Sequence, residues 1–113
     1  MDKITFEDFL IIMSYDVLKN QSCIEIEFCI DNSTIYQCSW LGKTVGRNSG
    51  EVVYWFGLTA DGTQAYEFDS LEQLLSANVF CGKSIRGIWR LVSIIAIDAC
   101  DTLERLSFYL KTP

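Results

Sequence analysis

The first residues that could carry out chemistry are two glutamates on one predicted strand. In the segment CIEIEFCI, residues 23–30, Glu25 and Glu27 alternate with apolar residues, so both carboxylates point to the same side. Positions i and i+2 of a strand lie about 7 Å apart, which is within the range of carboxylate pairs that cleave glycosides. Glutamates on a solvated strand face are common, and nothing near them in the sequence marks one as a proton donor. We therefore predict no catalytic residue here and no enzyme.

A second segment approximates a phosphate-binding loop. Residues 77–84 read ANVFCGKS, and the apolar strand that ends at Asp98 resembles the acidic strand that holds magnesium in such proteins. The pattern requires glycine where Ala77 stands, and it requires a strand before the loop, whereas the preceding residues have a helical period. The side chains at 79–81 are also bulky for a loop that must wrap phosphates. We interpret residues 82–84 as a turn and a helix cap, and predict no cofactor.

The cysteine and histidine content restricts the remaining chemistry. The chain has five cysteines and no histidine. The cysteines are Cys23, Cys29, Cys38, Cys81 and Cys100, an odd number without a Cys-x-x-Cys pair. This pattern disfavours a disulfide framework and a zinc site, and it predicts reduced, mostly buried thiols. Without histidine, neither a Ser-His-Asp triad nor a histidine metal site can form, so we predict no metal.

The elements that position these residues are indicated by two hydrophobic periods. Helical spacing and capping residues predict helices over 5–18, 70–78, 82–92 and 101–110. Alternation and β-branched runs predict strands over 23–30, 34–40, 51–59, 63–69 and 92–98. Three glycines in LGKTVGRNSGE, residues 41–51, predict a flexible loop. The nearly all-apolar run at 92–98 predicts a strand inside the sheet or covered on both faces.

These elements predict an α+β fold. We expect a mostly antiparallel sheet of four to five strands, with N-terminal and C-terminal helices packed on one face, in the chain order α-β-β-β-β-α-α-β-α. The length of 113 residues suits one hydrophobic core, so residues 1–113 are expected to form a single globular domain.

The charge balance restricts the partners. Nine Lys and Arg against fifteen Asp and Glu give a net charge of −6, which repels phosphate backbones and anionic lipids. The N-terminal segment is acidic and its longest apolar run covers residues 9–13, too short for a signal peptide or a membrane span. We therefore predict no nucleic-acid partner, no membrane partner, and a cytoplasmic location.

Three adjacent aromatics at residues 54–56 raise the question of which face each one serves. Strand alternation places Tyr54 and Phe56 on the core face and Trp55 on the side that carries the two glutamates. Trp55 then either packs under a second layer or belongs to an open face that binds a partner. The candidate partner-binding residues are Glu25, Glu27, Trp40, Lys43 and Trp55.

Three functions from different classes are compatible with the sequence. The first is a non-enzymatic interaction module, inhibitor-like or immunity-like, that binds a basic protein through an acidic and aromatic sheet face or the loop. The second is a homodimer that buries its open sheet face against its twin. The third is a small-ligand-binding domain or a weak enzyme with a pocket near Trp40, Lys43 and Trp55.

Overall fold

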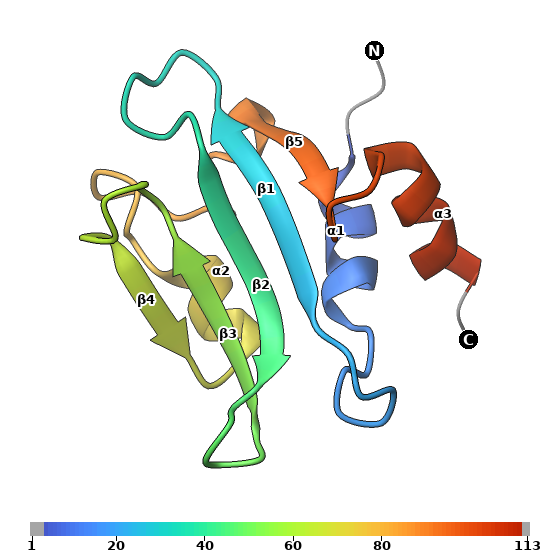
Figure 1. Cartoon of the computed structure of the whole chain (residues 1–113). Coiled ribbons are helices and arrows are strands. Elements are labelled where there is room, and N and C mark those ends of the chain that lie inside the picture. The colour runs from blue at the N-terminus through green and yellow to red at the C-terminus, as the bar shows by residue number, and fades with distance from the viewer. Residues whose placement is uncertain (1–3, 112–113) are drawn as a thin grey trace.

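A five-stranded antiparallel sheet forms the centre of the protein (Figure 1). The computed structural model describes residues 4–111. The strands are β1 (Ile24–Ile30), β2 (Ser39–Val45), β3 (Val52–Gly57), β4 (Ala65–Phe68) and β5 (Val92–Ile97), in the spatial order β4-β3-β2-β1-β5. The predicted α+β class with an antiparallel sheet and terminal helices is confirmed.

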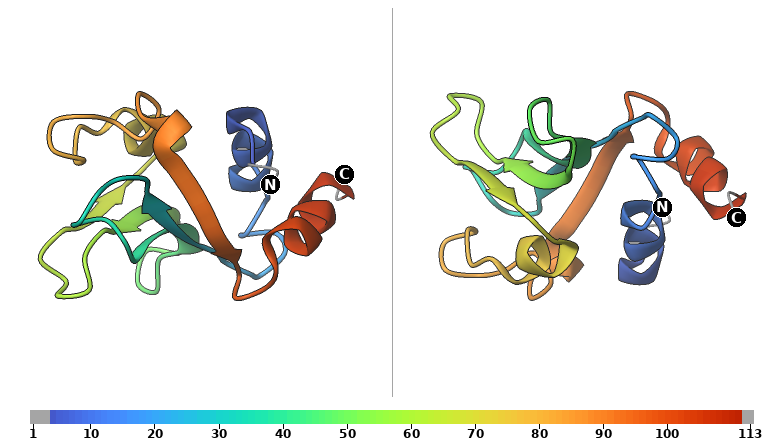
Figure 2. Two further views of the ribbon diagram at one scale, coloured as in Figure 1. Left: turned by 90° about the horizontal axis from the view of Figure 1, so that it is seen from above. Right: turned by 90° about the horizontal axis from the view of Figure 1, so that it is seen from below.

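The helices cover one side of this sheet and the end beyond β5. They are α1 (Phe6–Met13), α2 (Leu71–Ser76), the short 3-10 helix η1 (Trp89–Leu91) and α3 (Thr102–Lys111). Figure 2 shows α1 and α3 side by side past β5, with β1–β4 on the other side of that strand. The predicted caps are confirmed: Thr5 accepts from the Asp8 N–H, and Ser70 accepts from the Gln73 N–H.

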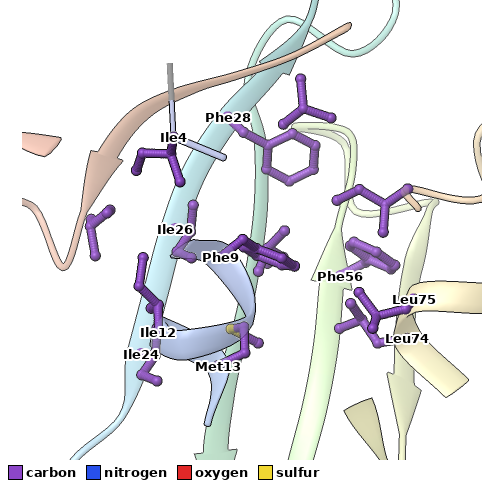
Figure 3. Close-up of a cluster of buried hydrophobic side chains, with 14 of the residues drawn as sticks. Ile4, Phe9, Ile12, Met13, Ile24, Ile26, Phe28, Phe56, Leu74 and Leu75 are labelled. Atoms are coloured by element: carbon purple, nitrogen blue, oxygen red, sulfur yellow. The ribbon is translucent and has the colours of Figure 1, made fainter. Parts of the chain in front are cut away.

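The core lies between α1, α2 and the side of the sheet that faces them (Figure 3). Ile24, Ile26 and Phe28 alternate along β1 and are fully buried in the core, where Phe28 packs on the ring of Phe80. On β3, Phe56 lies near Leu74 and Leu75 of α2. Because successive strand residues point to opposite faces, the residues between these core positions lie on a side of β1–β4 that no helix covers in Figure 1.

The second strand lies further along the chain than predicted. Residues 34–40 were expected to form it and 41–51 to be a flexible loop, but β2 spans Ser39–Val45 and only residues 46–51 connect it to β3. Gly42 suggested a loop, yet it lies inside the ladder, opposite Glu25 on β1 and Trp55 on β3. Glycine at this position permits close packing rather than flexibility, as shown below.

The prediction of a helix over 82–92 is wrong. Residues 80–83 instead form a tight turn, closed by hydrogen bonds between Phe80 and Lys83, with Cys81 and Gly82 at φ 53° and 85°. Only η1 is helical in this segment. Its Trp89 packs on the rings of Phe6 and Phe9, so tertiary contacts outweigh a helical pattern already weakened by an interior glycine.

β5 is an edge strand, because among residues 4–111 it pairs with β1 alone, so of the two predicted placements the one inside the sheet is wrong. Its apolar character reflects burial of Val92 and Ile97 in the core and packing of α3 along it. A register break opposite Glu27 and Phe28 leaves Ile95 without a pairing residue, and this side chain is 47% exposed.

Two helices differ from prediction in length or orientation. α1 ends at Met13 rather than near residue 18, and the chain then turns with the Lys19 N–H donating to Asp16 Oδ1. α3 begins as predicted, with the Glu104 N–H bound by Asp101. The helical spacing predicts Leu103, Leu106 and either Tyr109 or Leu110 on the inner side of α3. Tyr109 is buried and Leu106 is half-buried, whereas Leu103 and Leu110 are 54% and 48% exposed.

Candidate functional site

The uncovered side of β1–β4, here called the outer face, carries the acidic and aromatic residues in two rows. The rows are Glu25, Gly42, Trp55 and Glu67, and beside them Glu27, Trp40, Gly57 and Ala65. Within each row the residues are direct cross-strand neighbours. Each tryptophan therefore lies next to a glycine of the adjacent strand, and carboxylates flank the pair of tryptophans on both sides.

Trp55 lies across β2 at Gly42. A Cβ atom at position 42 would be 2.5 Å from Trp55 Cζ2 and 2.2 Å from the Ile24 carbonyl oxygen. Only glycine permits both approaches, because real carbon atoms in contact are about 3.5–4.0 Å apart. The indole is thus held against backbone, an arrangement in which an aromatic side chain covers a glycine on a neighbouring strand. This contact fixes the orientation of Trp55 without a second layer over the outer face.

A groove of about 430 Å³ runs between the two tryptophans. It is lined by Glu25, Cys38, Trp40, Trp55, Gly57, Thr59 and Ala60. The two indoles provide its apolar surface, Gly57 leaves room between them, and the turn from β3 to β4 closes one end. The groove thus combines large aromatic surfaces with a carboxylate, in a size at the lower end of ligand sites.

The charges around the groove are negative. The outward positions of β1–β4 carry Glu25, Glu27 and Glu67, and no lysine or arginine occupies an outward position of these four strands. At the turn that closes the groove, hydrogen bonds from the Thr59 hydroxyl and from the N–H and hydroxyl of Thr63 lower the pKa of Asp61 to about 2. Asp61 therefore stays ionised at physiological pH and adds to the negative potential.

Four of the five predicted residues lie together on the outer face. Glu25 and Glu27 come from β1, Trp40 from β2 and Trp55 from β3, and the predicted orientation of Trp55 toward the glutamate side is confirmed by the strand register. The sequence placed the two glutamates correctly because their strand alternates clearly. It could not show that Trp40 points outward, because its own strand was predicted five residues too early.

Lys43 is not part of this face, which corrects its inclusion among the candidate residues. It lies on the core side of β2, opposite Ile24 and Tyr54, and is 6% exposed. Its Nζ donates to the carbonyl oxygens of Met13 (2.9 Å) and Tyr15 (2.8 Å). Burial lowers the pKa of the Lys43 ammonium. Lys43 therefore binds the carbonyl end of α1, where a cation is favourable, and it does not line the groove between Trp40 and Trp55.

The structure also reveals a network at Asp98 that the sequence did not indicate. Asp98 Oδ1 accepts from the Glu25 N–H (2.8 Å), and Oδ2 accepts from Arg105 Nε (2.8 Å) and from the Tyr109 hydroxyl. Burial, with the hydrogen bond to Asp98, raises the pKa of Tyr109 well above its ordinary value. The network fixes the backbone of Glu25 through the carboxylate of Asp98. Arg105 and Tyr109 stand seven and eleven residues after Asp98 in the sequence, which by itself indicates only that Asp98 is a carboxylate at the end of a strand.

The segment that approximates a phosphate loop and the cysteines both differ from what the sequence indicates. Phe80, in the segment that approximates a phosphate loop, is buried in the core, and that segment is a tight turn instead of a loop open to phosphate. The expectation of mostly buried thiols is wrong. Cys29 on β1 is half-buried, and the other four cysteines, which lie outside the five strands and the helices, are exposed: Cys23, Cys38, Cys81 and Cys100.

A larger groove, of about 620 Å³, lies between α1 and α3. It is lined by Leu10, Ile11, Ser14, Tyr15, Asp16, Lys19, Asn20 and Tyr109. Its two charged residues, Asp16 and Lys19, have opposite signs, so its charge does not select a class of ligand. The outer face differs in this respect, because its charges have a single sign.

Comparison of the chain with protein-family models, with curated proteins and with solved structures gave no match. Among residues 4–111, no group of three or more histidine, cysteine, aspartate or glutamate side chains is arranged to hold a metal ion. Within the same range, no helix is long and apolar enough to span a membrane.

Proposed function

We propose that this protein is a non-enzymatic interaction module that binds a basic protein through its outer face. The observation that supports this most directly is the arrangement of Trp40 and Trp55 on an uncovered sheet face, surrounded by glutamates and free of basic residues. Tryptophan is enriched among the residues that dominate binding energy at protein interfaces. A cation over an indole contributes about 0.5–2 kcal/mol, depending on how far it is desolvated.

The overall charge supports the same class of partner. A net charge of −6 accelerates encounter with a basic protein at low salt, and the carboxylates of the outer face then favour the correct orientation. An inhibitor or an immunity protein that neutralises a basic partner has these properties, and we propose this role by analogy of size and charge. The exposed thiols suit a reducing compartment, which supports a cytoplasmic location.

The outer face is a poor choice for a homodimer interface. In a two-fold dimer the same patch lies on both subunits, so the patch with Glu25, Glu27 and Glu67 would lie against a second patch of the same negative charge. Such like-charge contacts are unfavourable in a desolvated interface. A basic partner replaces this repulsion with attraction.

Affinity capture with charge-matched variants tests the proposal. The immobilised protein is exposed to lysate of its native organism at low and moderate salt, as wild type, as Glu25→Gln/Glu27→Gln, and as Glu7→Gln/Glu104→Gln. Both double variants lose two negative charges, but Glu7 and Glu104 are exposed on α1 and α3, away from the outer face. We expect one basic protein that is released by salt, lost with the outer-face variant and retained by the helix variant. Equal capture by all three proteins contradicts the proposal.

A further inference from the structure

The groove between the tryptophans has the dimensions and lining of a site for one side chain. Its volume of about 430 Å³ is at the low end of ligand sites, too small for a helix or a strand of the partner. Its Trp55 wall is held in place before binding, because the indole lies against the Gly42 backbone. A pre-formed aromatic site loses little side-chain entropy when it is filled.

The backbone of the glutamate at the groove is also held in place, and within residues 4–111 its carboxylate has no cationic partner. The Glu25 N–H donates to Asp98 Oδ1, and the Asp98 N–H donates to the Glu25 carbonyl oxygen (2.7 Å). Within residues 4–111 no lysine or arginine is paired with Glu25 or Glu27, whereas Glu72 pairs with Arg86 and Asp98 with Arg105. Glu25 and Glu27 are therefore available to pair with a cation from outside the chain.

We propose that the groove holds the guanidinium of a single arginine of the partner, stacked on an indole and paired with the Glu25 carboxylate. This inference rests on the proposed function and specifies its chemistry. A guanidinium is planar and weakly hydrated, stacks on aromatic faces, and presents parallel N–H groups that match a carboxylate. A lysine ammonium is compact and strongly hydrated, so it gains less from a groove whose walls are mostly aromatic.

The test is an NMR titration that observes the tryptophan indole N–H groups. The probes are the capped tripeptides Gly-Arg-Gly, Gly-Lys-Gly and Gly-citrulline-Gly, followed by tetra-arginine and tetra-lysine. Citrulline has nearly the shape of arginine without its charge. Trp89 is an internal reference, because its Nε1 donates to the Ile4 carbonyl oxygen inside the protein (3.2 Å). Trp40→Phe and Trp55→Phe assign the two remaining indole signals.

We expect the arginine tripeptide to shift the indole signals of Trp40 and Trp55, to leave that of Trp89 in place, and to bind at least fivefold more tightly than the lysine and citrulline tripeptides. Glu25→Gln should weaken arginine binding about tenfold toward the citrulline level. The matched change Glu67→Gln, on the same face but outside the groove lining, should have less than a twofold effect.

Other outcomes separate this inference from the proposed function. If tetra-lysine and tetra-arginine shift the β1 and β2 amides equally and leave both indoles unmoved, the acidic face binds cations but the arginine site is refuted. If citrulline shifts the indoles as strongly as arginine, the groove does not select charge and the inference fails. If no cationic peptide perturbs the outer face at millimolar concentration, both the inference and the proposed function fail.

Discussion

Replacing Gly42 with alanine tests the close approach that orients Trp55. The new Cβ would lie 2.2 Å from the Ile24 carbonyl oxygen and 2.5 Å from Trp55 Cζ2. Both distances are short of ordinary contact by about 1 Å or more. The indole can rotate away, but the carbonyl belongs to the backbone of β1 and moves only if β1 and β2 separate. The substitution therefore strains the pairing at the centre of the sheet and displaces Trp55.

The expected cost follows from this geometry. Introducing one extra carbon into a closely packed site typically lowers the free energy of unfolding by about 1–3 kcal/mol. Because a backbone atom must move, we expect a value in the upper half of that range, about 2–3 kcal/mol. With a typical urea dependence, this lowers the midpoint of unfolding by roughly 1–2 M.

Gly57→Ala is the matched control, since both glycines lie on central strands and point to the outer face. A Cβ at position 57 has Trp55 Cζ3 at 4.0 Å as its nearest neighbour, which is ordinary contact. We expect it to leave stability unchanged or to raise it by about 0.4–1 kcal/mol, because alanine reduces the entropy of the unfolded chain. Urea unfolding followed by circular dichroism measures both variants. If Gly42→Ala is tolerated as well as Gly57→Ala, the packing of Trp55 on Gly42 is refuted.

Three further substitutions, the last with a control, test individual hydrogen bonds and one strained backbone position. Tyr109→Phe removes the donor to Asp98 and should lower the free energy of unfolding by about 1.5–3 kcal/mol near neutral pH. The folded-state pKa of Tyr109 is raised above 10.0, so the stability difference between wild type and Tyr109→Phe should be complete below pH 10 and shrink above it. Urea titrations at several pH values measure this difference, and a difference that grows above pH 10 would contradict the hydrogen bond from Tyr109 to Asp98. Asp61→Asn should destabilise the protein at pH 6, because the carboxylate accepts hydrogen bonds from Thr59 and Thr63 that lower its folded-state pKa. The stability difference from wild type should vanish as the pH falls from 3.8 to about 2. A difference that does not depend on pH would show that the carboxylate does not make these hydrogen bonds. Ala99→Gly relieves a left-handed residue at φ 62° and should raise thermal stability by about 1 kcal/mol, whereas Ala96→Gly in β5 should lower it; equal effects would argue against strain at position 99.

The hydrophobic period predicted the parts of the fold in which burial alternates without interruption. The β1 strand is an example, because Ile24, Ile26 and Phe28 are buried and the residues between them face outward. The period failed where a residue has a structural role that its type does not suggest. Glycine at position 42 suggests a flexible loop. Only the neighbouring strands show that the Trp55 indole and the Ile24 carbonyl oxygen occupy the space that a side chain would fill.

The candidate site could also be predicted from the sequence only in part. The two glutamates and Trp55 could be assigned to one face from alternation alone. Lys43 could not be placed correctly, because its alternation depends on the true start of β2, and a buried lysine is exceptional unless its ammonium group is bound. The Asp98 network was also missed, since its partners come from two elements, β1 and α3, that only the fold brings together.

Binding of a basic protein by the outer face is tested by measuring the affinity of the captured partner for charge-matched variants. Isothermal titration at moderate salt would compare wild type, Glu25→Gln/Glu27→Gln and Glu7→Gln/Glu104→Gln. We expect the outer-face variant to bind about tenfold more weakly, a loss of roughly 1.4 kcal/mol, and the helix variant to stay within twofold of wild type. Equal weakening of both variants would mean that only net charge matters, and would contradict a binding site on the outer face.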